Sequence, residues 1–144
     1  MDYEENSVLV HPTDMCLLFG RLLLSLLFLQ EGAALAANLD AAIDAMGKLG
    51  VIAPVVIATI ALQLAAGLAI ALGLFTRLAA VGLGLFCLST ALLFHTNFAN
   101  HNELLHFEKD LAIAGGMFTL VVAGAGKLSL DMFVQRHWKT KIAF

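Results

Sequence analysis

The stretch between residues 95 and 110 carries most of the side chains that could do chemistry. It holds three of the five histidines, His95, His101 and His106, together with three acidic residues. Their His-x5-His-x4-His spacing matches no established metal pattern, so we expect a solvated loop rather than a metal site. His95 and His106 each border an apolar run and should therefore lie at one depth. A quinone head group is the favoured ligand for such a pair, and a haem is the less favoured one.

Three further polar residues lie inside apolar runs. Arg21 either extends to the lipid headgroups or is buried in a functional role. Glu31 is ten residues further along the same run, about 15 Å away if the run is helical, so it cannot pair with Arg21. A loop histidine or Lys109 is the expected partner of Glu31. For Gln63 we favour a hydrogen bond between helices over a ligand contact.

These six residues are our candidate ligand-binding residues, and we assign no catalytic residue. They are Arg21, Glu31, Gln63, His95, His101 and His106.

The elements that position them must be membrane helices. Of the 144 residues, 60% are apolar and 13% are charged, and the mean hydropathy is +0.90. Soluble domains are much more polar, so this composition excludes a soluble enzyme, a disordered tail and a disulfide-rich secreted module. The net charge of −3 and the absence of a large basic patch exclude a nucleic-acid partner. The expected surroundings are a lipid bilayer.

Four apolar runs, at about 15–37, 51–75, 78–98 and 111–128, approach the roughly 20 residues that a membrane-spanning helix needs. We therefore predict an all-α polytopic membrane protein, an antiparallel four-helix transmembrane bundle over residues 15–128. Residues 38–50 should form a short interfacial helix, and Thr76–Arg77 a tight turn. The second half of the loop 97–110 should fold back onto the bundle and bring His106 toward Glu31.

The basic residues predict the orientation. Because the number of spans is even, residues 1–14 and 129–144 lie on the same side of the membrane. That side carries five lysines and arginines and the other side two, Lys48 and Lys109, so both termini should be cytoplasmic in a bacterial inner membrane. The tail 129–144 is basic and amphipathic and should lie on the membrane surface. The five are Arg77, Lys127, Arg136, Lys139 and Lys141.

Short sequence segments resemble those of a known family. Gly-Leu at 67–68 is followed by Leu-Gly-Leu-Phe-Thr-Arg at 72–77, and Gly-Gly at 115–116 by Gly-Ala-Gly-Lys-Leu-Ser-Leu-Asp at 124–131. In this order they resemble the DoxX family of small four-helix bacterial membrane proteins, over roughly residues 18–131. That family commonly carries an acidic residue in the second span, where this chain has Gln63. A proton or cation step that needs a carboxylate at that point is therefore not expected.

The resemblance implies a redox-associated membrane subunit, by analogy alone. Our first hypothesis is that the protein binds a quinone, or holds an oxidoreductase partner at the outer face near the histidines. A non-enzymatic scaffold or assembly factor is the second, and a permeation pathway for a small solute or protons along Arg21, Gln63 and Glu31 is the third. A homo-oligomer is left open. The two cysteines, Cys16 and Cys87, form no Cys-x-x-Cys motif and should remain free thiols.

Overall fold

A computed structural model describes residues 11–135 of the chain, and within them the fold is all-helical, without strands. A further helical segment begins at Leu130 and continues to Gln135, the last described residue. The five principal helices are α1 (Pro12–Ala37), α2 (Leu39–Gly47), α3 (Ala53–Leu72), α4 (Thr76–Phe94) and α5 (His101–Ala123).

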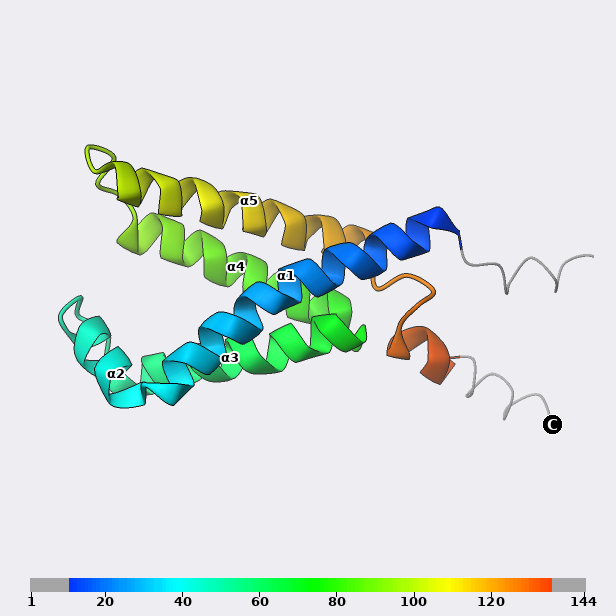
Figure 1. The fold of residues 1–144 in the computed structure, drawn as a ribbon, viewed down its shortest axis with the longest axis horizontal. Coiled ribbons are helices and arrows are strands. Elements are labelled where there is room, and N and C mark those ends of the chain that lie inside the picture. Colours follow the sequence, from blue (N-terminus) through cyan, green and yellow to red (C-terminus); the bar gives the residue numbers. More distant parts are fainter. Residues whose placement is uncertain (1–10, 136–144) are drawn as a thin grey trace, which may run out of the picture.

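The four long helices run in alternating directions along the length of the structure, and the α1–α3 pair is inclined to the α4–α5 pair, so that the two pairs diverge toward α2 (Figure 1). Helix α1 packs mainly on α3, α4 packs mainly on α5, and α3 joins the two pairs through its contact with α4. The short helix α2 packs on the first turns of α3, where Ala42 meets Val56 and Ile60. Because the long helices alternate, the described chain begins and ends at the same end of the structure (Figure 1).

Three helices, α1, α3 and α4, are long and apolar enough to cross a membrane. Helix α5 is equally long, but its first half carries Glu103, Glu108, Lys109 and Asp110. The structure therefore supports a membrane protein with three candidate spans, while the fourth predicted span lies on a more polar helix.

The boundaries of α5 differ from the prediction at both ends. Residues 101–110 form the first turns of α5 and do not fold back as a loop. The Asn100 side chain accepts a hydrogen bond from the backbone N–H of Asn102, and this cap starts the helix early. The helix ends at Ala123, because Gly124 and Gly126 both adopt positive φ angles.

Local features fix the start of α1 and the turn between α3 and α4. The N-cap of α1 is His11, and Asp14 in the first turn accepts a hydrogen bond from the His11 backbone N–H at 3.1 Å. The turn between α3 and α4 falls at residues 73–75, before the predicted Thr76–Arg77. Gly73 ends α3 in the left-handed region (φ 71°), where the absence of a Cβ removes the steric cost.

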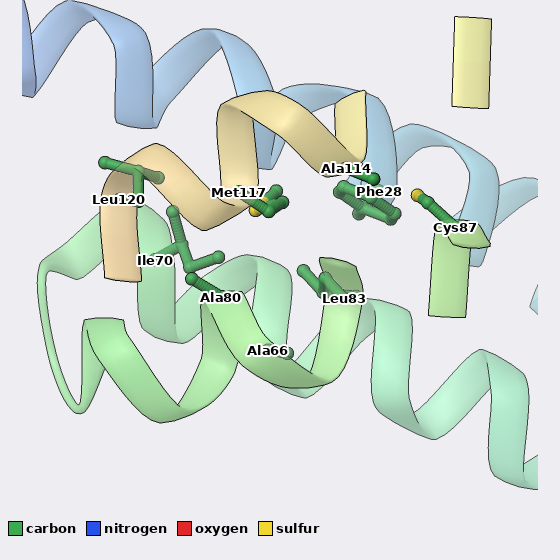
Figure 2. Close-up of a cluster of buried hydrophobic side chains, with 9 residues drawn as sticks. All are labelled: Phe28, Ala66, Ile70, Ala80, Leu83, Cys87, Ala114, Met117 and Leu120. Atoms are coloured by element: carbon green, nitrogen blue, oxygen red, sulfur yellow. The ribbon is translucent and has the colours of Figure 1, made fainter. Parts of the chain in front are cut away.

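The buried core lies where α3 and α4 cross α1 and α5 (Figure 2). Its large side chains, Phe28, Ile70, Leu83 and Met117, are at most 1% exposed. Small residues between them let the helices approach closely. At Gly84, for example, an added Cβ would lie 3.3 Å from the Met117 Cβ. The nine core residues are Phe28, Ala66, Ile70, Ala80, Leu83, Cys87, Ala114, Met117 and Leu120.

Candidate functional site

A cavity of about 390 Å³ opens between the α1–α3 pair and the α4–α5 pair, next to the loop that joins α4 to α5. Its volume lies within the ~300–1,000 Å³ range of small-molecule sites. Apolar side chains, among them Phe28, Phe86 and Ile113, form much of its wall. Four of the six candidate residues line this cavity: Glu31, Gln63, His95 and His106. Side chains separated by up to 75 positions in the chain are thereby brought to one site.

Glu31 from α1 faces Lys109 from α5 across the mouth of the cavity. Their closest charged atoms, Glu31 Oε1 and Lys109 Nζ, are 3.7 Å apart. Both side chains are more than two-fifths exposed, so the pair contributes little stability. We predicted that Glu31 pairs with Lys109 or with a loop histidine, and in the structure its partner is Lys109. The pair joins α1 to α5 at this end.

His95 follows directly on α4 and lies between two carboxylates of α5. Its Nδ1 is 2.8 Å from Glu103 Oε2, and its Nε2 is 4.0 Å from Asp110 Oδ2. The ring of His106 stacks on the His95 ring, with the centroids 5.1 Å apart. His106 is thus held against His95. The expected folded-back loop is instead the first part of helix α5, and His106 and Glu31 line the same cavity.

Asp110 connects this pair to the interior. The carboxylate is nearly buried, at 9% exposure, and its Oδ2 accepts a hydrogen bond of 2.9 Å from the Thr90 hydroxyl of α4. Glu103, at the other side of His95, is about one-third exposed. Glu103, His95, Asp110 and Thr90 therefore form a continuous polar row from the exposed rim to the cavity wall.

Gln63 is the deepest polar residue of the cavity. It lies in the middle of α3, is 3% exposed, and its Oε1 has no hydrogen-bond partner among the described residues. The hydrogen bond between helices that we favoured for Gln63 is therefore absent at this oxygen.

The other two candidates lie elsewhere. His101 is the first residue of α5, is exposed, and does not line the cavity. Arg21 lies at the opposite end of the long helices and is 1% exposed. Its Nη1 and Nη2 donate hydrogen bonds to the carbonyls of Ala125 and Leu128, in the segment that follows α5.

Around Arg21, the chain is held largely by bonds between side chains and backbone. Asp131 accepts a hydrogen bond from the Phe75 backbone N–H at 3.1 Å, and its own N–H donates to the Gly73 carbonyl at 3.0 Å. Asp14 accepts from the Lys127 backbone N–H at 3.0 Å. The sequence segments that resemble the DoxX family, at 72–77 and 124–131, thus meet each other at this end.

Sequence reasoning missed two residues of the cavity, Asp110 and Thr90. Asp110 is the last charged residue before the final apolar run, and that position could have marked it as an acid at the membrane boundary. Thr90 carried no signal, because a threonine inside a span commonly bonds its own helix backbone. Among residues 11–135, no group of three or more histidine, cysteine or acidic side chains is arranged to hold a metal ion. Both cysteines are free thiols, as predicted, with Cys16 exposed and Cys87 buried.

Comparison with known proteins identifies the family. Residues 16–96 match the family described as DoxX. The chain is 37% identical over 128 residues to the inner membrane protein YqjF of Escherichia coli K12, covering 87% of this chain and 96% of that protein. It is 33% identical over 122 residues to the inner membrane protein YphA of the same organism, covering 80% and 87% respectively. No solved structure matches the chain. With its three apolar helices, the chain is an integral membrane protein that belongs to the DoxX family.

Proposed function

We propose that this protein is a four-helix inner-membrane subunit that binds a quinone-type ring in the cavity beside His95. The observation that carries the proposal is the convergence of Glu31, Gln63, His95 and His106 on one apolar-walled cavity. A quinone ring is flat and apolar with polar oxygens at two opposite positions. Apolar walls with a few polar groups at defined points are suited to such a ligand.

The membrane arrangement belongs to the same proposal. Helix α5 would be the fourth span, with its charged first half at the outer boundary and its apolar second half in the bilayer. Both ends of the described chain lie at one end of the structure (Figure 1). Of the described lysines and arginines, Arg21, Arg77 and Lys127 lie at that end and Lys48 and Lys109 at the other, while Arg136, Lys139 and Lys141 lie outside the described residues. Together with the sequence count, this favours a cytoplasmic location for both termini. A cytoplasmic reporter fused after Phe144 should be active, whereas activity of a periplasmic reporter there would reverse the orientation.

Binding of a soluble short-chain ubiquinone to the purified protein tests the function. We expect His95→Asn and Glu31→Gln each to weaken binding by about tenfold, because each removes a polar group of the cavity at a cost typical of one charged hydrogen bond. The matched controls are His101→Asn and Glu108→Gln, which change the same residue types outside the cavity and should leave the affinity unchanged. Equal losses in the cavity variants and their controls would contradict the proposal.

A permeation pathway along Arg21, Gln63 and Glu31 is less well supported. Gln63 is ten residues from Gly73, where the Arg21 guanidinium lies, a distance of about 15 Å along α3. Ile70, Leu83 and Met117 fill the core between α3, α4 and α5, and all are fully buried. The described residues therefore place a packed apolar core between the two polar ends.

A further inference from the structure

The two carboxylates that face His95 differ in their surroundings. The Glu103 side chain is 32% exposed and lies outside the cavity, whereas the Asp110 side chain is 12% exposed and lines the cavity. The His95 side chain, at 25% exposure, lies between them. The ring therefore separates water at the rim from an acid at the cavity wall.

The contact with Glu103 determines which nitrogen of His95 can exchange a proton. An ionised carboxylate only accepts hydrogen bonds, so His95 Nδ1 carries the hydrogen that faces Glu103 Oε2 at 2.8 Å. Nε2 is then the nitrogen that gains and loses a proton. It lies 4.0 Å from Asp110 Oδ2, so a direct transfer requires the two side chains to approach by about 1 Å. Side-chain motion in partly exposed residues allows such an approach.

Thr90 lets Asp110 hold a proton without leaving another group unpaired. The Thr90 hydroxyl has one hydrogen and lies 2.9 Å from both Asp110 Oδ2 and the Cys87 carbonyl oxygen. When Asp110 is ionised, the hydroxyl donates to it. When Asp110 is protonated, its O–H can donate to Thr90 Oγ1 while the hydroxyl turns to the Cys87 carbonyl. Both protonation states of Asp110 are thereby accommodated.

No other carboxylate of the cavity wall is placed in this way. Glu31 faces Lys109 at 3.7 Å, and the two charges offset each other. Helices α2 and α3 contribute no titratable side chain to the cavity wall. Besides His95 and Asp110, the titratable side chains that line the cavity are Glu31 from α1, Cys87 from α4, and His106 and Lys109 from α5.

We propose that His95 transfers a proton from water at the rim to Asp110 at the cavity wall. His95 takes up the proton at Nε2 and passes it to Asp110 Oδ2, so one proton moves and an imidazolium–carboxylate pair becomes a neutral pair. The use of this proton by a ligand rests on the proposed quinone-binding function. A protonated Asp110 donates a hydrogen bond to a quinone oxygen, whereas an ionised Asp110 brings a second acceptor against it.

Infrared difference spectroscopy after a rapid drop in pH tests the transfer in the purified protein. Between about pH 8 and about pH 5, the range in which histidine changes charge, the wild type should gain an absorption of protonated carboxyl groups. The part due to Asp110 should be missing in Asp110→Asn, which keeps the shape of the side chain. In His95→Asn it should appear in full but about a hundredfold more slowly, because an amide does not carry the proton. The matched control, His101→Asn at an exposed histidine, should keep the wild-type rate.

A second measurement needs no variant. Dicyclohexylcarbodiimide reacts with protonated carboxyl groups in apolar surroundings, and mass spectrometry locates the adduct. At about pH 5 it should label Asp110 of the wild type more strongly than the exposed Glu108, and the label at Asp110 should decrease toward about pH 8. An unlabelled Asp110 at both pH values would contradict the proposal.

The outcomes separate this inference from the proposed function. If Asp110→Asn gains the same carboxyl absorption as the wild type, Asp110 takes up no proton and the inference is refuted. An unchanged rate in His95→Asn would refute the role of His95. Short-chain ubiquinone should raise the protonated share of Asp110 at neutral pH. If it leaves that share unchanged while His95→Asn still slows the uptake, the proton transfer is supported and the quinone contact fails.

Discussion

At one end of the long helices, Arg21 donates hydrogen bonds to the backbone carbonyls of Ala125 and Leu128. At the other end, His95 lies between the carboxylates of Glu103 and Asp110 beside a cavity of about 390 Å³. We call these the Arg21 end and the His95 end. Polar side chains at the Arg21 end bond mainly to backbone and join segments distant in sequence. Those at the His95 end bond mainly to one another. Each end also holds buried polar atoms without a partner among the described residues: Arg21 Nε and Thr76 Oγ1 at the Arg21 end, and Gln63 Oε1 at the His95 end.

This difference indicates different roles. Hydrogen bonds to backbone carbonyls fix where a segment lies, and losing them leaves buried groups unsatisfied. A cluster of side chains around an open cavity can exchange partners when a ligand enters. We therefore expect substitutions at the Arg21 end to change stability, and substitutions at the His95 end to change binding.

The largest expected effect is that of Gly73→Val. Gly73 has a φ of 71°, and a Cβ there would lie 2.5 Å from both Arg21 Nη1 and Ser129 Cβ. Backbone strain and displacement of the arginine together should lower the free energy of unfolding by about 4 kcal/mol. Thermal unfolding of the purified protein in detergent, followed by circular dichroism, measures the loss. A variant as stable as the wild type would show that the Arg21 end is not tightly packed.

Arg21→Met should have a smaller but still large effect. It removes both hydrogen bonds to the segment after α5 and should cost about 2–3 kcal/mol, measured in the same way. Arg77→Gln is the matched control at this end, because Arg77 makes a single long, exposed hydrogen bond of 3.4 Å to the Val122 carbonyl. We expect that control to change stability by less than about 0.5 kcal/mol.

His95→Asn provides the comparison at the other end of the same helices. Of the two carboxylates that face His95, Glu103 is accessible to water and Asp110 keeps its hydrogen bond from Thr90. The His95→Asn variant should therefore lose less stability than Arg21→Met. If His95→Asn destabilised the protein more than Arg21→Met, both ends would be structural, and the proposed separation of roles would be lost.

Apolar runs were sufficient to predict the all-helical fold and the approximate extents of α1, α3 and α4. Bilayer-length hydrophobic segments leave few alternatives, because the backbone must satisfy its own hydrogen bonds. The extension of α5 back to His101 was not predictable by that rule. It depends on the Asn100 cap and on an edge-to-face contact between the rings of Phe98 and Phe107 at the boundary.

The candidate site was predicted in part. Glu31, Gln63, His95 and His106 were chosen as polar groups in or beside apolar runs, and the structure places all four at one cavity. Their individual partners were not predictable. The contact between His95 and Glu103 depends on the conformation of the six residues between α4 and α5, and the partners of Arg21 are backbone carbonyls, which any residue type supplies.

The bond between Arg21 and Leu128 also bears on the order of events during synthesis. The two residues are 107 positions apart. The carbonyl groups that bind the Arg21 side chain are therefore synthesised only when nearly all of the chain has been translated. The α1–α3 and α4–α5 pairs are formed by helices close in sequence and can assemble while the ribosome is still working. Until residues 125–128 emerge, Arg21 must be hydrated or held by other groups at the membrane edge. Truncation shortly before residue 125 would therefore leave a chain that contains all four long helices but cannot complete its packing.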